Sequence, residues 1–306
     1  MTHAVVTENL VKHFGPVQAL RGVSLRIPEG STFGLVGPNG AGKTTLFSIV
    51  AGFLRPTSGS VNVLGAAVAG ENLLGKLSVL PQDARFRKGV PMGSQLALCA
   101  RLQGYTPAET DSEVRRVLEL TGMEGYADRV PDKLSHGMAK RMAIAQALMG
   151  DPQIILLDEP LAGLDPAQAR RIRLLIQQES GRRTFIISSH VMADIEMLCT
   201  HVAIIKAGEI AAQPSMKELT HREAVAVFTL EQPPDPGIAG IFEAIDYVSK
   251  AEVRPVERKL QLTIRTDQKN LDEAVADLIK VLVEKQIAFV GIQKGTSLED
   301  AVLKIT

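Results

Sequence analysis

The sequence GPNGAGKTT, residues 37–45, is the strongest indicator of local structure in this chain. It fits the pattern G-x-x-x-x-G-K-[ST] and lies between a predicted strand, TFGLVG, and a predicted helix, LFSIVAGFL. Glycines let the backbone N–H groups of such a loop surround phosphates, while Lys43 reaches the β- and γ-phosphates and the Thr44 hydroxyl ligates Mg²⁺. The strand–loop–helix order favours this phosphate-binding loop over a simple glycine-rich turn. Its residues are Gly37, Pro38, Asn39, Gly40, Ala41, Gly42, Lys43, Thr44 and Thr45.

The sequence IILLDEP, residues 154–160, predicts the other half of a nucleotide site. Four consecutive apolar residues are typical of a buried strand in a parallel sheet, with Asp158 at its carboxyl end. There Asp158 can hold magnesium through water, and Glu159 can polarise a water that attacks the γ-phosphate, as a general base does. Two charges that merely end a strand are the alternative interpretation.

The sequence LSHGMAKR, residues 134–141, leads directly into a predicted helix. A helix N-terminus gathers unpaired N–H groups and a partial positive charge. A hydroxyl at Ser135 and the close approach that Gly137 allows would therefore suit an anion such as phosphate. A surface helix capped by Ser135 explains the same residues, so this segment alone leaves both interpretations open.

Short apolar strands alternate with helices over most of the chain. Residues 4–36 contain β-like runs broken by turns, and residues 94–149 are mostly helical by periodicity. A helix over about 166–179 separates IILLDEP from a similar strand, RTFIISSH. This order predicts an α/β fold with a parallel sheet.

A different order begins near Thr220. A strand, a helix, two strands, an amphipathic helix and a last strand follow one another, from EAVAVFTL to IAFVGIQ. The order β-α-β-β-α-β is that of a ferredoxin-like α+β domain. We therefore expect a first domain over residues 1–220 and a small accessory domain over residues 221–306.

Composition narrows the class of protein and of partner. Lys plus Arg and Asp plus Glu both total 34, so there is no net basic field to attract nucleic acid or an anionic bilayer. No segment approaches the about 20 apolar residues of a membrane-spanning helix, and the N-terminus lacks an export-signal pattern. Cys99 and Cys199 have no metal or redox spacing, which fits a reducing compartment. We expect a cytoplasmic protein that binds no nucleic acid.

The motifs GPNGAGKTT, LSHGMAKR, IILLDEP, LAGLD and IISSH follow one another in the first domain. This order resembles that of the ATPase subunit of an ATP-binding-cassette (ABC) transporter, from residue 4 to about residue 220. The tail, which ends SLEDAVLKIT, resembles the C-terminal extension of bacterial cassettes of the drug- and polymer-export (ABC-2) type. The resemblance implies a P-loop NTPase cassette with a mixed sheet and a helical subdomain over about residues 86–150.

The resemblance also implies an activity and partners. The chain would bind ATP with Mg²⁺ and hydrolyse it. It would pair head-to-tail with a second copy and drive a separate integral-membrane permease, an exporter, from the inner face of the cell membrane. The transported substrate does not follow from the resemblance, because the cassette contacts the permease and not the cargo.

Further residues receive roles from the resemblance. Phe14 in KHFG would stack on adenine, and Gln82 in LPQD would approach Mg²⁺ and the attacking water. Asp165 in LAGLD would contact the partner subunit, a role compatible with capping the next helix. His190 would contact the γ-phosphate and orient Glu159 or the water. Without the resemblance, the Phe would be assigned to the core, the Gln to solvent and the His to a structural role.

Residues 134–138 correspond to the signature loop of the family, which usually reads L-S-G-G-Q. Ser135 and Gly137 match this pattern, whereas His136 replaces the first Gly and Met138 replaces the Gln. The hydroxyl and backbone donors remain and the Gln side chain is lost. We expect the loop to reach the ATP of the other subunit, with an altered affinity or rate.

Two other classes of function are compatible with the motifs. A soluble cassette could act on ribosomes or DNA as a mechanical or regulatory factor. Translation-associated cassettes usually carry two phosphate loops in tandem, however, and this sequence has one. A nucleotide-binding sensor without turnover is the other class, and Glu159 argues against it.

Overall fold

The computed structural model describes residues 2–68, 73–216, 218, 224–265, 267–295, 298 and 302. The chain forms two compact units, Met1–Gln213 and Pro214–Thr306. The domain boundary expected near residue 220 falls among residues 219–223, which lie outside the described part of the chain.

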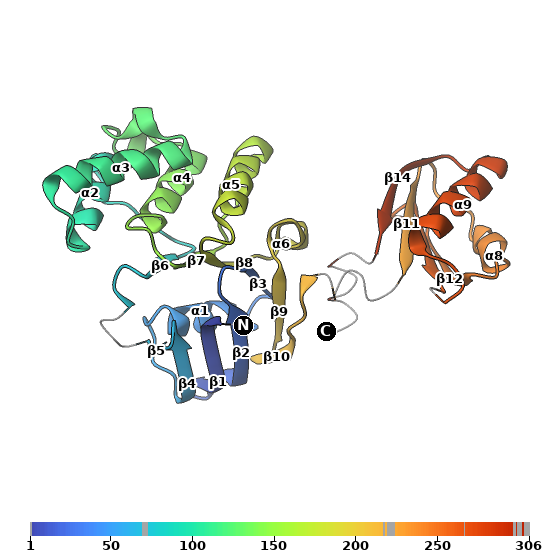
Figure 1. Ribbon diagram of the computed structural model, residues 1–306, viewed down its shortest axis with the longest axis horizontal. Coiled ribbons are helices and arrows are strands. Elements are labelled where there is room, and N and C mark those ends of the chain that lie inside the picture. Colours follow the sequence, from blue (N-terminus) through green and yellow to red (C-terminus); the bar gives the residue numbers. More distant parts are fainter. Residues whose placement is uncertain are drawn as a thin grey trace. The chain divides into compact units, whose positions relative to one another are not determined.

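A six-stranded sheet forms the centre of the first unit (Figure 1). Its order is β10-β9-β3-β8-β7-β6, and all neighbouring strands are parallel except β10, which runs antiparallel to β9. The strands are β3 (Thr32–Val36), β6 (Leu77–Leu80), β7 (Ile154–Asp158), β8 (Thr184–Ser188), β9 (His201–Lys206) and β10 (Glu209–Ala212). Every residue of β3, β7 and β8 is buried, which explains the apolar runs in these segments.

A second sheet of the first unit is antiparallel, with the order β2-β1-β4-β5. Its strands are β1 (His3–Phe14), β2 (Val17–Pro28), β4 (Ser58–Val63) and β5 (Ala66–Ala67). Gly15, at φ 56°, makes the turn between β1 and β2. Helix α1 (Lys43–Val50) buries Leu46, Phe47 and Ile49 in a core that it shares with both sheets.

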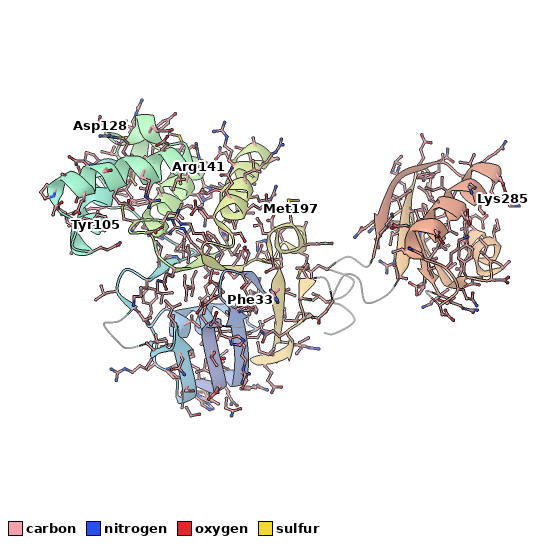
Figure 2. All side chains as sticks on the ribbon, in the orientation of Figure 1. Phe33, Tyr105, Asp128, Arg141, Met197 and Lys285 are labelled. Atoms are coloured by element: carbon pink, nitrogen blue, oxygen red, sulfur yellow. The ribbon has the colours of Figure 1, made fainter. Side chains whose placement is uncertain are left out.

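Three helices, α2, α3 and α4, form the green part of the first unit in Figure 1. Helix α3 begins with a capping box between Thr106 and Glu109 and ends at Gly122, which has φ 62°. Arg141 of α4 lies among these helices (Figure 2) and is buried. It donates a hydrogen bond to the carbonyl oxygen of Gly122 (3.0 Å). The elements are α2 (Met92–Leu102), α3 (Pro107–Thr121), α4 (His136–Ala147) and the 3₁₀ turns η2 (Glu124–Tyr126) and η3 (Pro131–Lys133).

Two further helices of the first unit are α5 (Pro166–Glu179) and α6 (Met192–Leu198). The longest helix that the structure describes, α3, has 15 residues, fewer than the about 20 that span a bilayer. Within the described ranges, no helix combines the length and the apolar character needed to cross a membrane.

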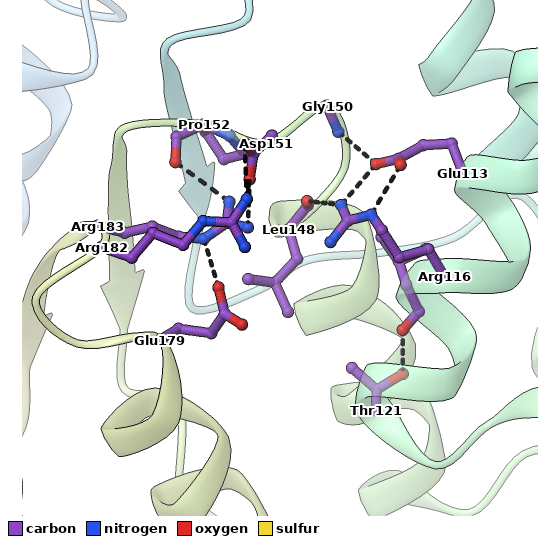
Figure 3. Close-up of polar contacts among 11 residues, drawn as sticks. Glu113, Arg116, Thr121, Leu148, Gly150, Asp151, Pro152, Glu179, Arg182 and Arg183 are labelled. Atoms are coloured by element: carbon purple, nitrogen blue, oxygen red, sulfur yellow. Dashed lines mark hydrogen bonds and ion pairs between the residues drawn. The ribbon is translucent and has the colours of Figure 1, made fainter.

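Polar contacts join α3 to the segment between α4 and β7 (Figure 3). The carboxylate of Glu113 accepts hydrogen bonds from the backbone N–H of Gly150 (2.7 Å) and from Nη2 of Arg116 (2.6 Å). Arg116 also donates to the carbonyl oxygen of Leu148 (2.9 Å). Because this segment leads into β7, the contacts connect the helical part with the central sheet.

The same segment is held from its other side by Arg183, whose side chain is 1% exposed. Its Nε donates to Glu179 (2.7 Å) and its Nη1 to the carbonyl oxygen of Pro152 (3.2 Å; Figure 3). Its Nη2 lies 2.5 Å from Oδ1 of Asp151, an ion pair without the angle of a hydrogen bond. The buried guanidinium is therefore paired, as a buried charge must be.

The second unit contains a four-stranded antiparallel sheet with the order β12-β13-β11-β14. Its elements in chain order are β11 (Val225–Leu230), α8 (Ile238–Glu243), β12 (Val248–Arg254), β13 (Lys259–Ile264), α9 (Leu271–Glu284) and β14 (Phe289–Lys294). Alternate residues of β11, Ala226, Phe228 and Leu230, share a core with Phe242 of α8 and Leu278 of α9. Both helices therefore cover the same face of the sheet, and the unit has its own core.

Candidate functional site

The predicted phosphate-binding loop, residues 37–45, connects β3 to α1. Two of its glycines are required by contacts with neighbouring strands. A Cβ at Gly37 would lie 2.1 Å from the carbonyl oxygen of Ile205 in β9, and one at Gly42 would lie 2.7 Å from that of Ala19 in β2. Gly42 also has φ 107°, which L side chains rarely adopt. The lack of a side chain at these two glycines therefore lets the loop lie directly against β9 and β2.

Lys43, the first residue of α1, folds back over this loop. Its Nζ donates hydrogen bonds to the carbonyl oxygens of Gly37 (2.6 Å) and Pro38 (3.1 Å). Burial lowers the pKa of Lys43, and the negative charges of Glu159 and Asp158 oppose this shift without cancelling it. The ammonium group therefore lies where phosphate oxygens can replace the two carbonyls as acceptors.

The carboxyl ends of four parallel strands meet beside the loop. The loop follows β3, Gln82 follows β6, Asp158 ends β7 and His190 follows β8. Open α/β sheets bind ligands at this edge. The residues share one cavity of about 400 Å³. It is lined by Ala19, Asn39, Gly40, Gly42, Lys43, Thr44, Thr45, Gln82, Asp158, Glu159 and His190.

Ser188 connects the two carboxylate residues of this cavity. It lies opposite Asp158 in the pairing of β7 with β8, and its hydroxyl donates to Oδ1 of Asp158. Its Oγ and its carbonyl oxygen accept from the backbone N–H of Glu159, at 3.2 Å and 3.1 Å. All three residues are buried, and Ser188 holds the carboxylate of Asp158 and the backbone of Glu159 at the strand end.

His190 holds the carboxylate of Glu159. Oε1 of Glu159 accepts from the backbone N–H of His190 (3.1 Å) and lies 2.9 Å from its Nδ1. The side chain of Glu159 is 11% exposed and that of His190 is 62% exposed. A desolvated carboxylate in contact with an accessible imidazole can take part in proton transfer at the mouth of the cavity.

The donors in the cavity fit a nucleoside triphosphate with Mg²⁺. Lys43 and the loop N–H groups supply positive potential, and the oxygen atoms of Thr44, Gln82 and Asp158 are the hard donors that Mg²⁺ prefers. Across the residues that the structure describes, no group of three or more His, Cys, Asp and Glu side chains could hold a metal ion alone. Magnesium commonly uses one or two protein ligands together with substrate phosphates, which this cavity can accommodate.

Other expected site residues lie outside the cavity. Phe14 lies at the end of β1, 49% exposed, with Nζ of Lys12 at 5.2 Å from its ring centre. Ser135 caps α4 and Asp165 caps α5, each through its side-chain oxygen, and Gly137 lies in the first turn of α4. Residues of the phosphate-binding loop that do not line the cavity are Gly37, Pro38 and Ala41.

Sequence reasoning missed three residues near this site. Ser188 had a cue, since it belongs to the same IISSH motif as His190. Ala19 lines the cavity from β2, and nothing in the surrounding sequence marks it. Burial lowers the pKa of Lys140 in α4, while the charges of Asp158, Glu159 and Asp83 act to raise it. The ammonium group of Lys140 therefore lies close enough to the cavity to interact with the negative charges of Asp158 and Glu159.

The fold agrees with comparisons to known proteins. A family model described as ABC transporter matches residues 20–162. The uncharacterized ABC transporter ATP-binding protein YxlF of Bacillus subtilis is 31% identical over 300 residues, which are 97% of this chain and 98% of that protein. The linearmycin resistance ATP-binding protein LnrL of the same species is 28% identical over 277 residues, 88% of each chain.

Among solved structures, cbiO1 from Clostridium perfringens, part of the ABC transporter complex cbiONQ, is 28% identical with a TM-score of 0.64. The match covers 72% of this chain and 91% of that one. This chain belongs to the family of ABC transporter ATP-binding proteins. It has the expected P-loop cassette fold with a mixed sheet and helices, and it is an ATPase that uses ATP with Mg²⁺.

Proposed function

We propose that this chain is the nucleotide-binding subunit that energises a separate membrane permease, an exporter of the ABC-2 type. The observation that carries the proposal is the single cavity in which Lys43, Thr44, Asp158, Glu159 and His190 meet. Phosphoryl transfer asks little covalent chemistry of a protein, so positioning and charge neutralisation supply most of the catalysis.

Each cavity residue has a proposed role. Lys43 binds the β- and γ-phosphates, and the hydroxyl of Thr44 with Gln82 and Asp158 holds Mg²⁺. The bound ion neutralises charge on the phosphates. Glu159 polarises the attacking water, and His190 orients Glu159 through the Nδ1 contact of 2.9 Å.

Three residues outside the cavity also have proposed roles. Phe14 stacks on adenine, which its exposed ring permits. Ser135 and Asp165 lie at the starts of α4 and α5, where a second copy of the chain can approach them. In a head-to-tail dimer, the loop around Ser135 and Gly137 completes the ATP site of the partner.

Replacing Glu159 tests the assignment of the general base. We expect Glu159→Gln to bind ATP normally, to slow hydrolysis by about 10²–10⁴-fold and to accumulate an ATP-bound dimer. Steady-state ATPase assays and size-exclusion chromatography measure these effects. Glu209→Gln is the matched control, because it makes the same chemical change at an exposed position in β10. Normal turnover in Glu159→Gln would contradict the role.

The surface of helix α2 supports the proposal of a permease partner. This helix is the first α-helix after Gln82 in the described chain. Leu98 and Leu102, four residues apart on this helix, are 58% and 75% exposed. A contiguous apolar patch on a surface marks a place where another protein binds, and residues four apart on a helix lie on the same face. We propose that the permease docks here and that the chain works in the cytoplasm at the inner face of the membrane. The relative LnrL, named for resistance, favours export.

The second unit is proposed to be a ferredoxin-like accessory domain. Its β-α-β-β-α-β order, the sheet order β12-β13-β11-β14 and the two helices on one face all fit this fold. Residues 221–306 carry no phosphate-binding motif of their own, and we propose that this unit stabilises or regulates the dimer.

The alternative is a soluble cassette that acts on ribosomes or DNA. Purification from detergent-solubilised membranes separates the two classes. Recovery of an integral-membrane chain with the protein supports transport. Recovery of ribosomal RNA or DNA without such a chain would support the alternative. No observation on the described residues favours that alternative.

A further inference from the structure

The starts of α4 and α5 are in direct contact through Gly137 and Gln168. A Cβ at Gly137 would lie 1.5 Å from Oε1 of Gln168 and 2.5 Å from its Cδ. The end of the Gln168 side chain therefore occupies the space that a larger residue at position 137 would need. Gly137 is buried. Oε1 is also buried, and it has no hydrogen-bond donor among the residues that the structure describes.

Gln168 also holds the carboxylate of Asp165. Its Nε2 donates to Oδ2 of Asp165 (2.7 Å), and its backbone N–H donates to Oδ1 (2.9 Å). Both carboxylate oxygens are thus bound by one residue. The orientation of the Asp165 carboxylate therefore depends on Gln168, whose Oε1 lies against Gly137.

His136 makes a second contact between the same two segments. A Cβ at Gly163 would lie 2.8 Å from Cε1 of His136 and 3.3 Å from its Nδ1. Gly163 has φ 74°, so the backbone there already requires glycine. The imidazole that replaces the usual Gly of the signature loop therefore packs on the backbone of the LAGLD segment, residues 161–165.

We propose that Gln168 and His136 join the signature loop to the LAGLD segment, so that both move as one element when two copies close over ATP. A buried acceptor without a donor is unfavourable. The location of Oε1 of Gln168 against Gly137 therefore indicates that this side chain serves a purpose other than the stability of the fold. Gln168 is a positioning residue, because it acts through Gly137 and Asp165 and does not line the nucleotide cavity. The inference rests on the proposed function, in which both segments face the partner subunit.

A double-mutant cycle tests this connection. Gly137→Ala places a methyl group where Oε1 of Gln168 lies, and Gln168→Ala removes that amide. The readout is the amount of ATP-bound dimer in the Glu159→Gln background, measured by size-exclusion chromatography. We expect the amount of ATP-bound dimer to fall several-fold for Gln168→Ala and more for Gly137→Ala, because the added methyl group displaces the Gln168 amide from Asp165. The double variant should lose no more than Gln168→Ala alone, because the added methyl group then has room.

Controls separate failure of the connection from failure of the proposed function. Gln178→Ala, at an exposed position near the other end of α5, should leave dimer formation unchanged. Ser135→Arg should block the dimer while the isolated chain still binds ATP. If Ser135→Arg leaves the dimer intact, the proposed function fails. If Ser135→Arg blocks the dimer and the two single defects simply multiply in the double variant, the connection is overturned.

A second variant tests the connection without changing position 137. Gln168→Met keeps the length of the side chain and loses the donor to Asp165. We expect kcat for ATP hydrolysis to fall several-fold while the Kd for ATP of the isolated chain and the melting temperature stay unchanged. A purely structural role would lower the melting temperature and leave kcat unchanged. An unchanged kcat overturns the proposal even if Gly137→Ala fails to fold.

Discussion

At the scale of single residues, Glu159 carries backbone strain at the edge of the cavity. It has φ 50°, a left-handed conformation that is uncommon for residues other than glycine. Such strain persists only where surrounding contacts determine the conformation, and it concentrates at functional sites. Here Ser188 binds the backbone N–H of Glu159, and His190 binds its carboxylate. The strained turn directs the carboxylate back toward the residues that follow β8.

Replacing Ser188 tests this arrangement. Ser188→Ala removes the hydroxyl that holds Asp158 and accepts from Glu159. We expect kcat for ATP hydrolysis to fall by about tenfold, because the carboxylate of Asp158 loses the hydrogen bond that orients it and the backbone N–H of Glu159 loses one of its two acceptors. ATP binding without Mg²⁺ should not change. Ser189→Ala is the matched control, since its hydroxyl accepts only from the N–H of Val191 among the hydrogen bonds described. Equal kcat values for the two variants would disprove the positioning role of Ser188.

At the scale of elements, the contacts of Glu113 hold α3 against the segment between α4 and β7 (Figure 3). Burial acts to raise the pKa of Glu113. Hydrogen bonds from Arg116 and from the N–H of Gly150, together with the charge of Arg116, outweigh burial, so the pKa is lowered. The ionised form therefore stabilises the folded state. This contribution is fully present above the unfolded pKa of about 4.3 and is lost as the pH falls through the lower, folded pKa.

The stability of a Glu113 variant should accordingly depend on pH. Glu113→Gln should lower the free energy of unfolding by about 1–2 kcal/mol at pH 7, because a buried charge-assisted hydrogen bond is weakened. The difference from the unsubstituted chain should shrink below about pH 4. Urea denaturation at several pH values measures it. Glu119→Gln, exposed on the same helix, provides the control. A difference that persists undiminished at low pH would mean that the ionised carboxylate is not its source.

At the scale of the whole molecule, the two units have separate cores. The core of the second unit contains residues of β11, α8, β12, β13 and α9. The core around the phosphate-binding loop contains residues of the first unit. Each unit can therefore bury its own apolar surface, which is the physical requirement for folding as a domain.

Shortening the chain tests this independence. A chain that ends at Thr220 lacks every strand and helix of the second unit from β11 onward but keeps every residue that lines the nucleotide cavity. We expect it to bind ATP with unchanged affinity, as measured by isothermal titration calorimetry. Circular dichroism confirms that the shortened chain is folded. A folded but non-binding chain would show that the second unit contributes to the ATP site.

The sequence by itself determined the order of the elements and the chemistry of the central cavity. The apolar runs before residues 37–45 and 158–159 became buried strands, because a strand covered on both faces requires continuous apolar residues. Lys43, Asp158 and Glu159 could be placed together because they follow apolar strands of a parallel sheet, whose carboxyl ends share one edge, whereas Gln82 and His190 were assigned through the family resemblance. The strands β9 and β10 were not anticipated.

Only the tertiary structure decided which residues touch across these elements. The bond from Ser188 to Asp158, the contribution of Ala19 and the contact of Gln168 with Gly137 each join residues from different strands or helices. No local pattern encodes such contacts, because they depend on how the elements pack and on which rotamers fit between them. The sequence could show that His136 departs from the family. The fold alone shows that its ring lies on the backbone of the LAGLD segment, because that contact depends on a glycine 27 positions further along the chain.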